Sequence, residues 1–63
     1  MPFAKDDRVE STRELKYGTE LTLPKGSKGT VVGSGPIRAN VDFDADDKAV
    51  YRRVDNGDLK KVS

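Results

Sequence analysis

Three aspartates at alternate positions, Asp42, Asp44 and Asp46, have the residue type and spacing with which a calcium-binding loop begins. Such a loop needs a glycine at the next position and a carboxylate at its last position, but this chain has Asp47 and Arg53 there. On a strand, residues two apart also share one face and run along it instead of converging around an ion. We therefore expect no metal site here, but a solvated acidic edge opposite the arginines of the following strand.

Two adjacent arginines, Arg52 and Arg53, are the residue type that grips phosphate groups. Adjacent residues on a strand point to opposite faces of the sheet, so the pair cannot close on one phosphate. Arg53 would share a face with Tyr51, and Arg52 would share the other face with Val50 and Val54. The sequence therefore favours ion pairs at a strand edge.

Four lysines are candidate contacts for a nucleic-acid backbone, because they would gather if the last strand lay beside the corner at Gly26 and Gly29. Lysines at strand edges also keep a sheet from pairing with other chains, and both interpretations remain open. These lysines are Lys25, Lys28, Lys60 and Lys61.

Catalytic chemistry has few candidates, because the 63 residues include no histidine and no cysteine. The chain therefore lacks histidine, the commonest general base and metal ligand, and cysteine, whose thiolate serves as a nucleophile or metal ligand. We expect no enzyme, no catalytic residue, no metal and no cofactor. The formal net charge is +1, and the charges are balanced along the chain. That balance makes a general nucleic-acid binder less favoured, because such domains usually carry a basic excess.

Contact with a partner protein is the remaining possibility, and the aromatic residues bear on it. Phe43 is expected in the core, which leaves Tyr17 and Tyr51, too few for a groove that holds polyproline helices. We expect a partner surface around Tyr17 and the loop of residues 12–20. The candidate partner-binding residues are Leu15, Tyr17, Tyr51 and Arg53.

The size of the chain predicts one small domain, near the lower limit for folding without disulfides. Residues 1–6 are expected to be a loose lead-in, with Phe3 as a candidate anchor, and residues 7–63 to form the domain. No apolar run approaches the ~18 residues of a membrane span. The charged first residues lack the apolar core of a signal peptide, so we expect a cytoplasmic protein.

The elements that position these residues are predicted to be short strands. The clearest alternation runs from Ile37 to Phe43, with apolar side chains on one face. Pro24 and Gly26 suit the second and fourth positions of a turn, and Gly29 suits a positive φ or a bulge. Asn56 and Gly57 suit a tight turn with two positive φ angles. Strands are expected at residues 8–11, 28–32, 37–43, 49–54 and 59–62, with an extended segment at 21–23 and a long loop, at most one helical turn, at 12–20.

The predicted core collects the apolar residues of these strands. Its members are Val9, Leu21, Leu23, Val31, Ile37, Val41, Phe43, Val50, Leu59 and Val62.

This layout resembles the SH3-like barrels of small accessory subunits. The resemblance is carried by Arg8-Val9, the stretch from Lys25 to Val32, Val41-Asp42-Phe43, and Asp58 to Val62. The variable chain of ferredoxin–thioredoxin reductase and the E-type subunit of photosystem I are similar in layout, and residues 35–40 resemble a stretch of the former. The resemblance implies an all-β, five-stranded barrel and a non-enzymatic module that binds a partner protein through its loops. The step from Gly26 to Val32 is also similar to the KOW motif, which implies RNA or DNA binding as the alternative.

Overall fold

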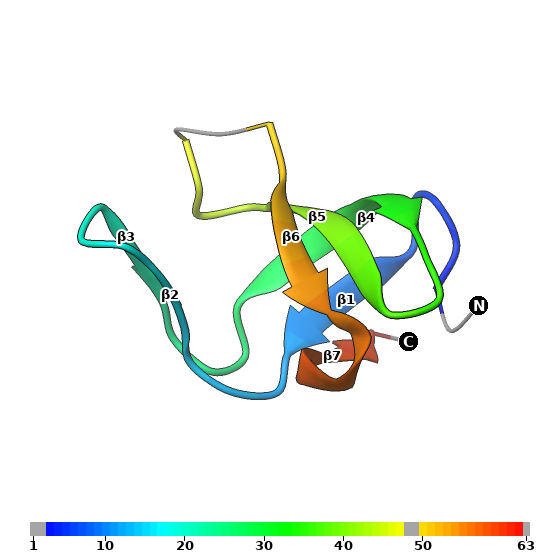
Figure 1. Ribbon diagram of the computed structural model, residues 1–63, viewed down its shortest axis with the longest axis horizontal. Coiled ribbons are helices and arrows are strands. Elements are labelled where there is room, and N and C mark those ends of the chain that lie inside the picture. The colour runs from blue at the N-terminus through cyan, green and yellow to red at the C-terminus, as the bar shows by residue number, and fades with distance from the viewer. Residues whose placement is uncertain (1–2, 48–49, 63) are drawn as a thin grey trace.

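The computed structural model describes residues 3–47 and 50–62, and in them the chain is all-β, with seven strands and one short 3-10 helix. Five strands form one antiparallel sheet in the order β6-β5-β4-β1-β7, and β2 and β3 form a separate hairpin (Figure 1). The all-β class is confirmed, but the strands divide into two sheets and do not close into the single five-stranded barrel that was expected. The strands are β1 (Arg8–Ser11), β2 (Leu15–Tyr17), β3 (Leu21–Leu23), β4 (Lys28–Ser34), β5 (Arg38–Phe43), β6 (Arg52–Asp55) and β7 (Leu59–Lys61), and the 3-10 helix η1 is Asn56–Asp58.

The centre of the larger sheet is the β4–β5 pair. Along β5, Ala39, Val41 and Phe43 are buried and the residues between them face outward, as the alternation predicts. The strand begins only at Arg38, so the preceding Ile37 lies outside the ladder and its side chain is 71% exposed. The bulge in β4 falls between Val31 and Gly33, not at the expected glycine.

Gly29 serves a different purpose from the positive φ or bulge that was predicted. It pairs directly with Phe43 on β5, and a Cβ atom built there would lie 2.7 Å from the backbone oxygen of Asp42 and 2.7 Å from Cγ1 of Val41. Glycine is therefore required because the two central strands approach each other closely.

The turn that leads into β4 is displaced by one residue from the prediction. The Ser27 amide donates to the Pro24 carbonyl at 3.1 Å, which places Gly26 at the third position of the turn, with φ of +87°. A positive φ at that position is typical of a type II turn and favours glycine. The buried hydroxyl of Ser11 donates to the same carbonyl and accepts from the Ser27 amide, both at 3.2 Å, so β1 holds this turn.

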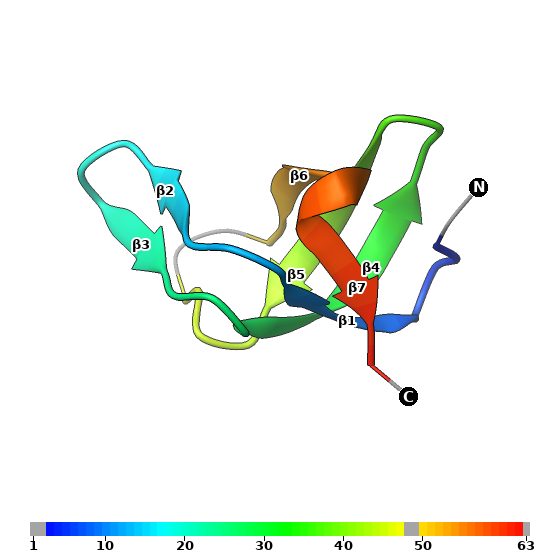
Figure 2. The same cartoon turned by 90° about the horizontal axis from the view of Figure 1, so that it is seen from below.

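Residues 12–20, which were predicted to be a long loop, contain β2 and the start of a hairpin. Leu15 pairs with Leu23 and Tyr17 with Leu21, and Gly18 takes a φ of +63° in the connecting turn. Figures 1 and 2 show this hairpin extending to one side of the five-stranded sheet. Leu15 and Leu23 are buried against the main sheet, so the hairpin is attached by its apolar side chains.

The C-terminal part of the chain follows the predicted order with shorter elements. The return strand β6 begins at Arg52 instead of residue 49, which lies outside the described residues. Val50 precedes β6, and its side chain is 78% exposed. Asn56 and Gly57 do not take positive φ angles; they form a turn of 3-10 helix.

The core lies between the inner face of the main sheet and the β2–β3 hairpin. Six of the ten predicted core residues are buried, and Leu21 and Val62 are only partly buried. Ile37 and Val50 are exposed, because both precede a strand and lie outside its ladder. Phe3 is also buried, and the amide of Asp6 donates to the Val31 carbonyl at 2.7 Å, so residues 3–6 of the expected lead-in contact the core and β4. The buried apolar residues are Phe3, Val9, Leu15, Leu23, Val31, Ala39, Val41, Phe43, Val54 and Leu59.

Candidate functional site

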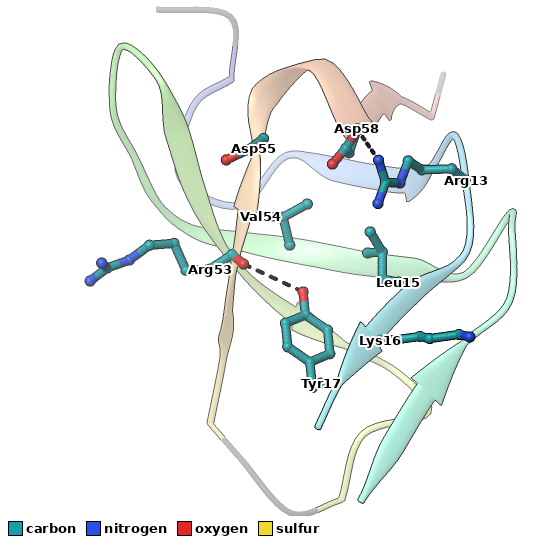
Figure 3. Close-up of a pocket in the computed structure, with 8 residues that line it drawn as sticks. All are labelled: Arg13, Leu15, Lys16, Tyr17, Arg53, Val54, Asp55 and Asp58. Carbon is teal, nitrogen blue, oxygen red and sulfur yellow. Dashed lines mark hydrogen bonds and ion pairs between the residues drawn. The ribbon is translucent and has the colours of Figure 1, made fainter. Parts of the chain in front are cut away.

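A pocket of about 180 Å³ lies between β2 and the end of β6, where the hairpin meets the edge of the main sheet (Figure 3). Its two walls come from different sheets, and η1 closes one end. The lining residues are Arg13, Leu15, Lys16, Tyr17, Arg53, Val54, Asp55 and Asp58.

The floor of the pocket is apolar. Leu15 of β2 and Val54 of β6 are 7% and 3% exposed, and Figure 3 shows both side chains pointing into the space between the strands. Val54 faces inward because it pairs with Ala39 on the buried face of β5. An occupant of this pocket would therefore place an apolar group on the floor.

Tyr17 forms the wall opposite η1 and joins the two sheets. Its hydroxyl donates to the backbone carbonyl of Arg53 at 3.4 Å, across 36 residues of sequence. The guanidinium carbon of Arg52 lies 5.0 Å from the centre of the Tyr17 ring, within the range of a cation–π contact. These two contacts fix the orientation of the ring.

Arg52 supports Tyr17 through an ion-pair network behind the ring. Its Nε lies 2.8 Å from Asp46, whose side chain is 2% exposed, and its Nη1 lies 3.3 Å from Glu20. The pair of Arg52 and Asp46 confirms the predicted ion-pair role of this arginine. Asp46 is buried, however, and does not belong to the solvated acidic edge that was expected. The network links the tip of the β2–β3 hairpin to the segment after β5.

Burial raises the pKa of the Tyr17 phenol above its ordinary value of 10.0; Arg52 opposes the shift, and Asp46, Asp58 and Asp55 add to it. Because the folded protein holds this proton more tightly than the unfolded chain, the resulting stability is present below pH 10 and is lost as pH rises through the higher pKa of the folded protein.

We expect the urea midpoint of the parent protein to fall between pH 9 and pH 11, and the fall to be smaller in Tyr17→Phe, which has no phenol to titrate. An equal fall in both proteins would contradict the assignment.

The charged rim of the pocket is only partly neutralised. Asp58 lies 4.0 Å from Arg13, and Asp55 lies 3.0 Å from Arg38, which is outside the pocket. Lys16 contacts Glu14 at 3.6 Å, in a pair whose side chains are both more than half exposed. Among residues 3–47 and 50–62, Arg53 has no carboxylate within ion-pair distance. The unpaired positive charge of Arg53 therefore lies beside the pocket, on a side chain that Figure 3 shows directed away from it.

The structure brings three of the four candidate partner-binding residues together. Leu15, Tyr17 and Arg53 line the pocket, although Leu15 is part of the floor and not of an exposed loop. Tyr51 is 48% exposed and does not line it. Sequence reasoning missed Arg13, Lys16, Val54, Asp55 and Asp58. Recognition of residues 15–17 as a strand would have identified Lys16 as a neighbour of Tyr17 on β2.

The four lysines do not all lie on one face of the sheet. Lys28 and Lys60 lie on either side of Glu10, which pairs with both across β4-β1-β7. Lys61 is adjacent to Lys60 on β7 and so points to the opposite face, where it contacts Asp7 at 3.7 Å. Lys25 is exposed in the turn before β4.

The three alternating aspartates also separate. Asp44 forms a two-fold hydrogen bond with Arg8, with distances of 3.1 and 2.7 Å, and this contact lowers the pKa of Asp44 below its ordinary value. Asp46 turns inward to Arg52, whereas Asp42 remains exposed on β5. Within the described ranges, no group of three or more acidic side chains is arranged to hold a metal ion.

In the described part of the chain, no helix is long and apolar enough to cross a membrane. Comparisons of the chain with protein-family models, with curated proteins and with solved structures gave no match.

Proposed function

We propose that this chain is a non-enzymatic accessory module that binds a partner protein at the pocket between β2 and β6. The observation that carries the proposal is a pocket whose lining comes from two separate sheets, with the side chains of Leu15 and Tyr17 from β2 and the backbone of Arg53 from β6. The apolar floor can take one apolar side chain of a partner, and the charged groups of the rim can orient it.

The order of elements supports an SH3-like module within this proposal. The structure contains a first strand, a projecting hairpin, three antiparallel strands, a 3-10 turn and a last strand beside the first, an all-β arrangement compatible with the resemblance that the sequence carries. Fold likeness is a weak guide to function, so the pocket and not the topology carries the argument.

The nucleic-acid alternative has less support. Lys28 and Lys60 are separated by Glu10, and Lys61 faces the other side of the sheet, so few lysines can contact one phosphate backbone together. With a net charge of +1, the chain also gives little long-range attraction.

The test is affinity capture from native lysate with Tyr17→Ala and Arg53→Ala, compared with the double variant Lys25→Ala and Lys28→Ala. We expect the first two variants to lose a captured protein, and the lysine variant to retain it after nuclease treatment. If the ligand were a nucleic acid held by four lysine–phosphate contacts, a plot of log affinity against log salt concentration would instead have a slope of about −3. A nuclease-sensitive, steeply salt-dependent capture that the lysine variant abolishes would overturn the proposal.

A further inference from the structure

β6 is the edge strand of the main sheet, and the hydrogen-bond pattern shows which of its backbone groups face outward. In an antiparallel pair, residues alternate between those that bond to the neighbour and those that point away from it. The Asn56 amide donates to the Ile37 carbonyl at 2.9 Å, so the bonded positions of β6 are Val54 and Arg52. Arg53 and Asp55 therefore direct their backbone groups away from β5.

The contact of Tyr17 with β6 confirms this direction independently. Its hydroxyl reaches the Arg53 carbonyl from the pocket side, which is the side opposite β5. Within residues 3–47 and 50–62, no acceptor is found for the amides of Arg53 and Asp55. These two donors, one strand repeat of ~6.7 Å apart, present the spacing to which another extended chain can bond.

The side chains around this edge indicate which extended chain fits. On the inner side, Val54 and Leu15 offer an apolar floor. On the outer side, Figure 3 shows the Arg53 side chain directed away from the pocket, and no described carboxylate pairs with it. The carboxylates of Asp55 and Asp58 already lie against arginines. A chain that adds to β6 would therefore place an apolar residue inward and acidic residues on either side of it outward, near Arg53.

We infer that the pocket receives an extended, acidic segment of the partner protein, which displaces the Tyr17 hydroxyl from the Arg53 carbonyl and adds to the edge of β6 as a further strand. This inference rests on the proposed function and names the chemistry of its partner. The segment alternates apolar and acidic residues, and its backbone accepts from Arg53 and Asp55.

The backbone geometry of Asp55 permits a direct test of the added strand. Its φ is −62°, the value that proline imposes, and its amide is outside the β5 ladder. Asp55→Pro therefore removes one outward donor while the β5–β6 pairing stays intact. Asp55→Ala is the matched control, because it loses the same ion pair with Arg38 and keeps the amide.

The probe is a capped seven-residue peptide of alternating glutamate and valine, titrated into the labelled full chain and followed by NMR. We expect saturable shifts of the Arg53 and Asp55 amides, and binding that is roughly threefold to tenfold weaker in Asp55→Pro than in Asp55→Ala, the effect of one lost hydrogen bond. Arg53→Glu should reverse the preference, so that a lysine–valine peptide binds better than the glutamate peptide.

Equal binding by the two Asp55 variants, shifts confined to other strands, or no saturable shift would overturn the inference. A single-stranded oligonucleotide that shifts the same amides more strongly than the peptide would also overturn it. The proposed function fails separately, if no protein is captured through Tyr17 and Arg53. Peptide binding at β6 without such capture would support the strand-binding edge and contradict the accessory role.

Discussion

Phe43→Ala is expected to unfold the domain at room temperature. Phe43 is 1% exposed at the end of β5 and is the largest of the fully buried side chains. Truncation of a buried phenylalanine costs about 3–5 kcal/mol, which equals the ~3–5 kcal/mol that a core of this size supplies in total. A two-dimensional amide NMR spectrum should lose its dispersion.

Ile37→Ala is the control for this prediction, because Ile37 belongs to the same apolar alternation but is 71% exposed. We expect its urea midpoint to stay close to that of the parent, since substitutions at exposed positions change stability by about 0.5 kcal/mol or less. A well-dispersed spectrum for Phe43→Ala, or unfolding by Ile37→Ala, would contradict the packing described above.

Gly29→Ala is expected to lower the free energy of unfolding by about 1–3 kcal/mol or more, because the added methyl group meets the backbone of β5 and the fully buried side chain of Val41. Gly57→Ala is the matched control, since a methyl group added at Gly57 would have no atom within 4 Å and the residue has no positive φ. Urea denaturation of the two variants checks the difference. Equal midpoints would show that β4 and β5 are not as close at Gly29 as described.

The larger sheet could be predicted from the sequence to a considerable extent, because residues 37–43 show clear alternation and a first strand was expected at residues 8–11, where β1 lies. The β2–β3 hairpin could not, since each strand has three residues and such a short alternation is indistinguishable from a loop. Alternation also gives no strand ends, which is why Ile37 and Val50 were assigned to the core. The need for glycine at position 29 depends on the distance between two strands, which no local pattern contains.

For the candidate site, too, individual residues could be selected from the local sequence, but their contacts across the fold could not be predicted. Tyr17 could be selected from the sequence as an aromatic residue outside the expected core, and Arg53 as a residue on the outer face of a strand. Their meeting could not be predicted, because it depends on how the hairpin packs against β6. The same holds for Asp46, which reaches Arg52 only because the segment after β5 folds back toward the core.

The central claim is that a protein partner occupies the pocket between β2 and β6, and site-specific photo-cross-linking tests it most directly. Lys16 lines the pocket with a side chain that is 71% exposed, and Lys60 lies on β7, the opposite edge of the main sheet. A photoreactive residue at either position should leave the fold intact. We predict a nuclease-resistant adduct with a protein from position 16 and none from position 60. Adducts from position 60 alone, or adducts with nucleic acid from either position, would contradict the account.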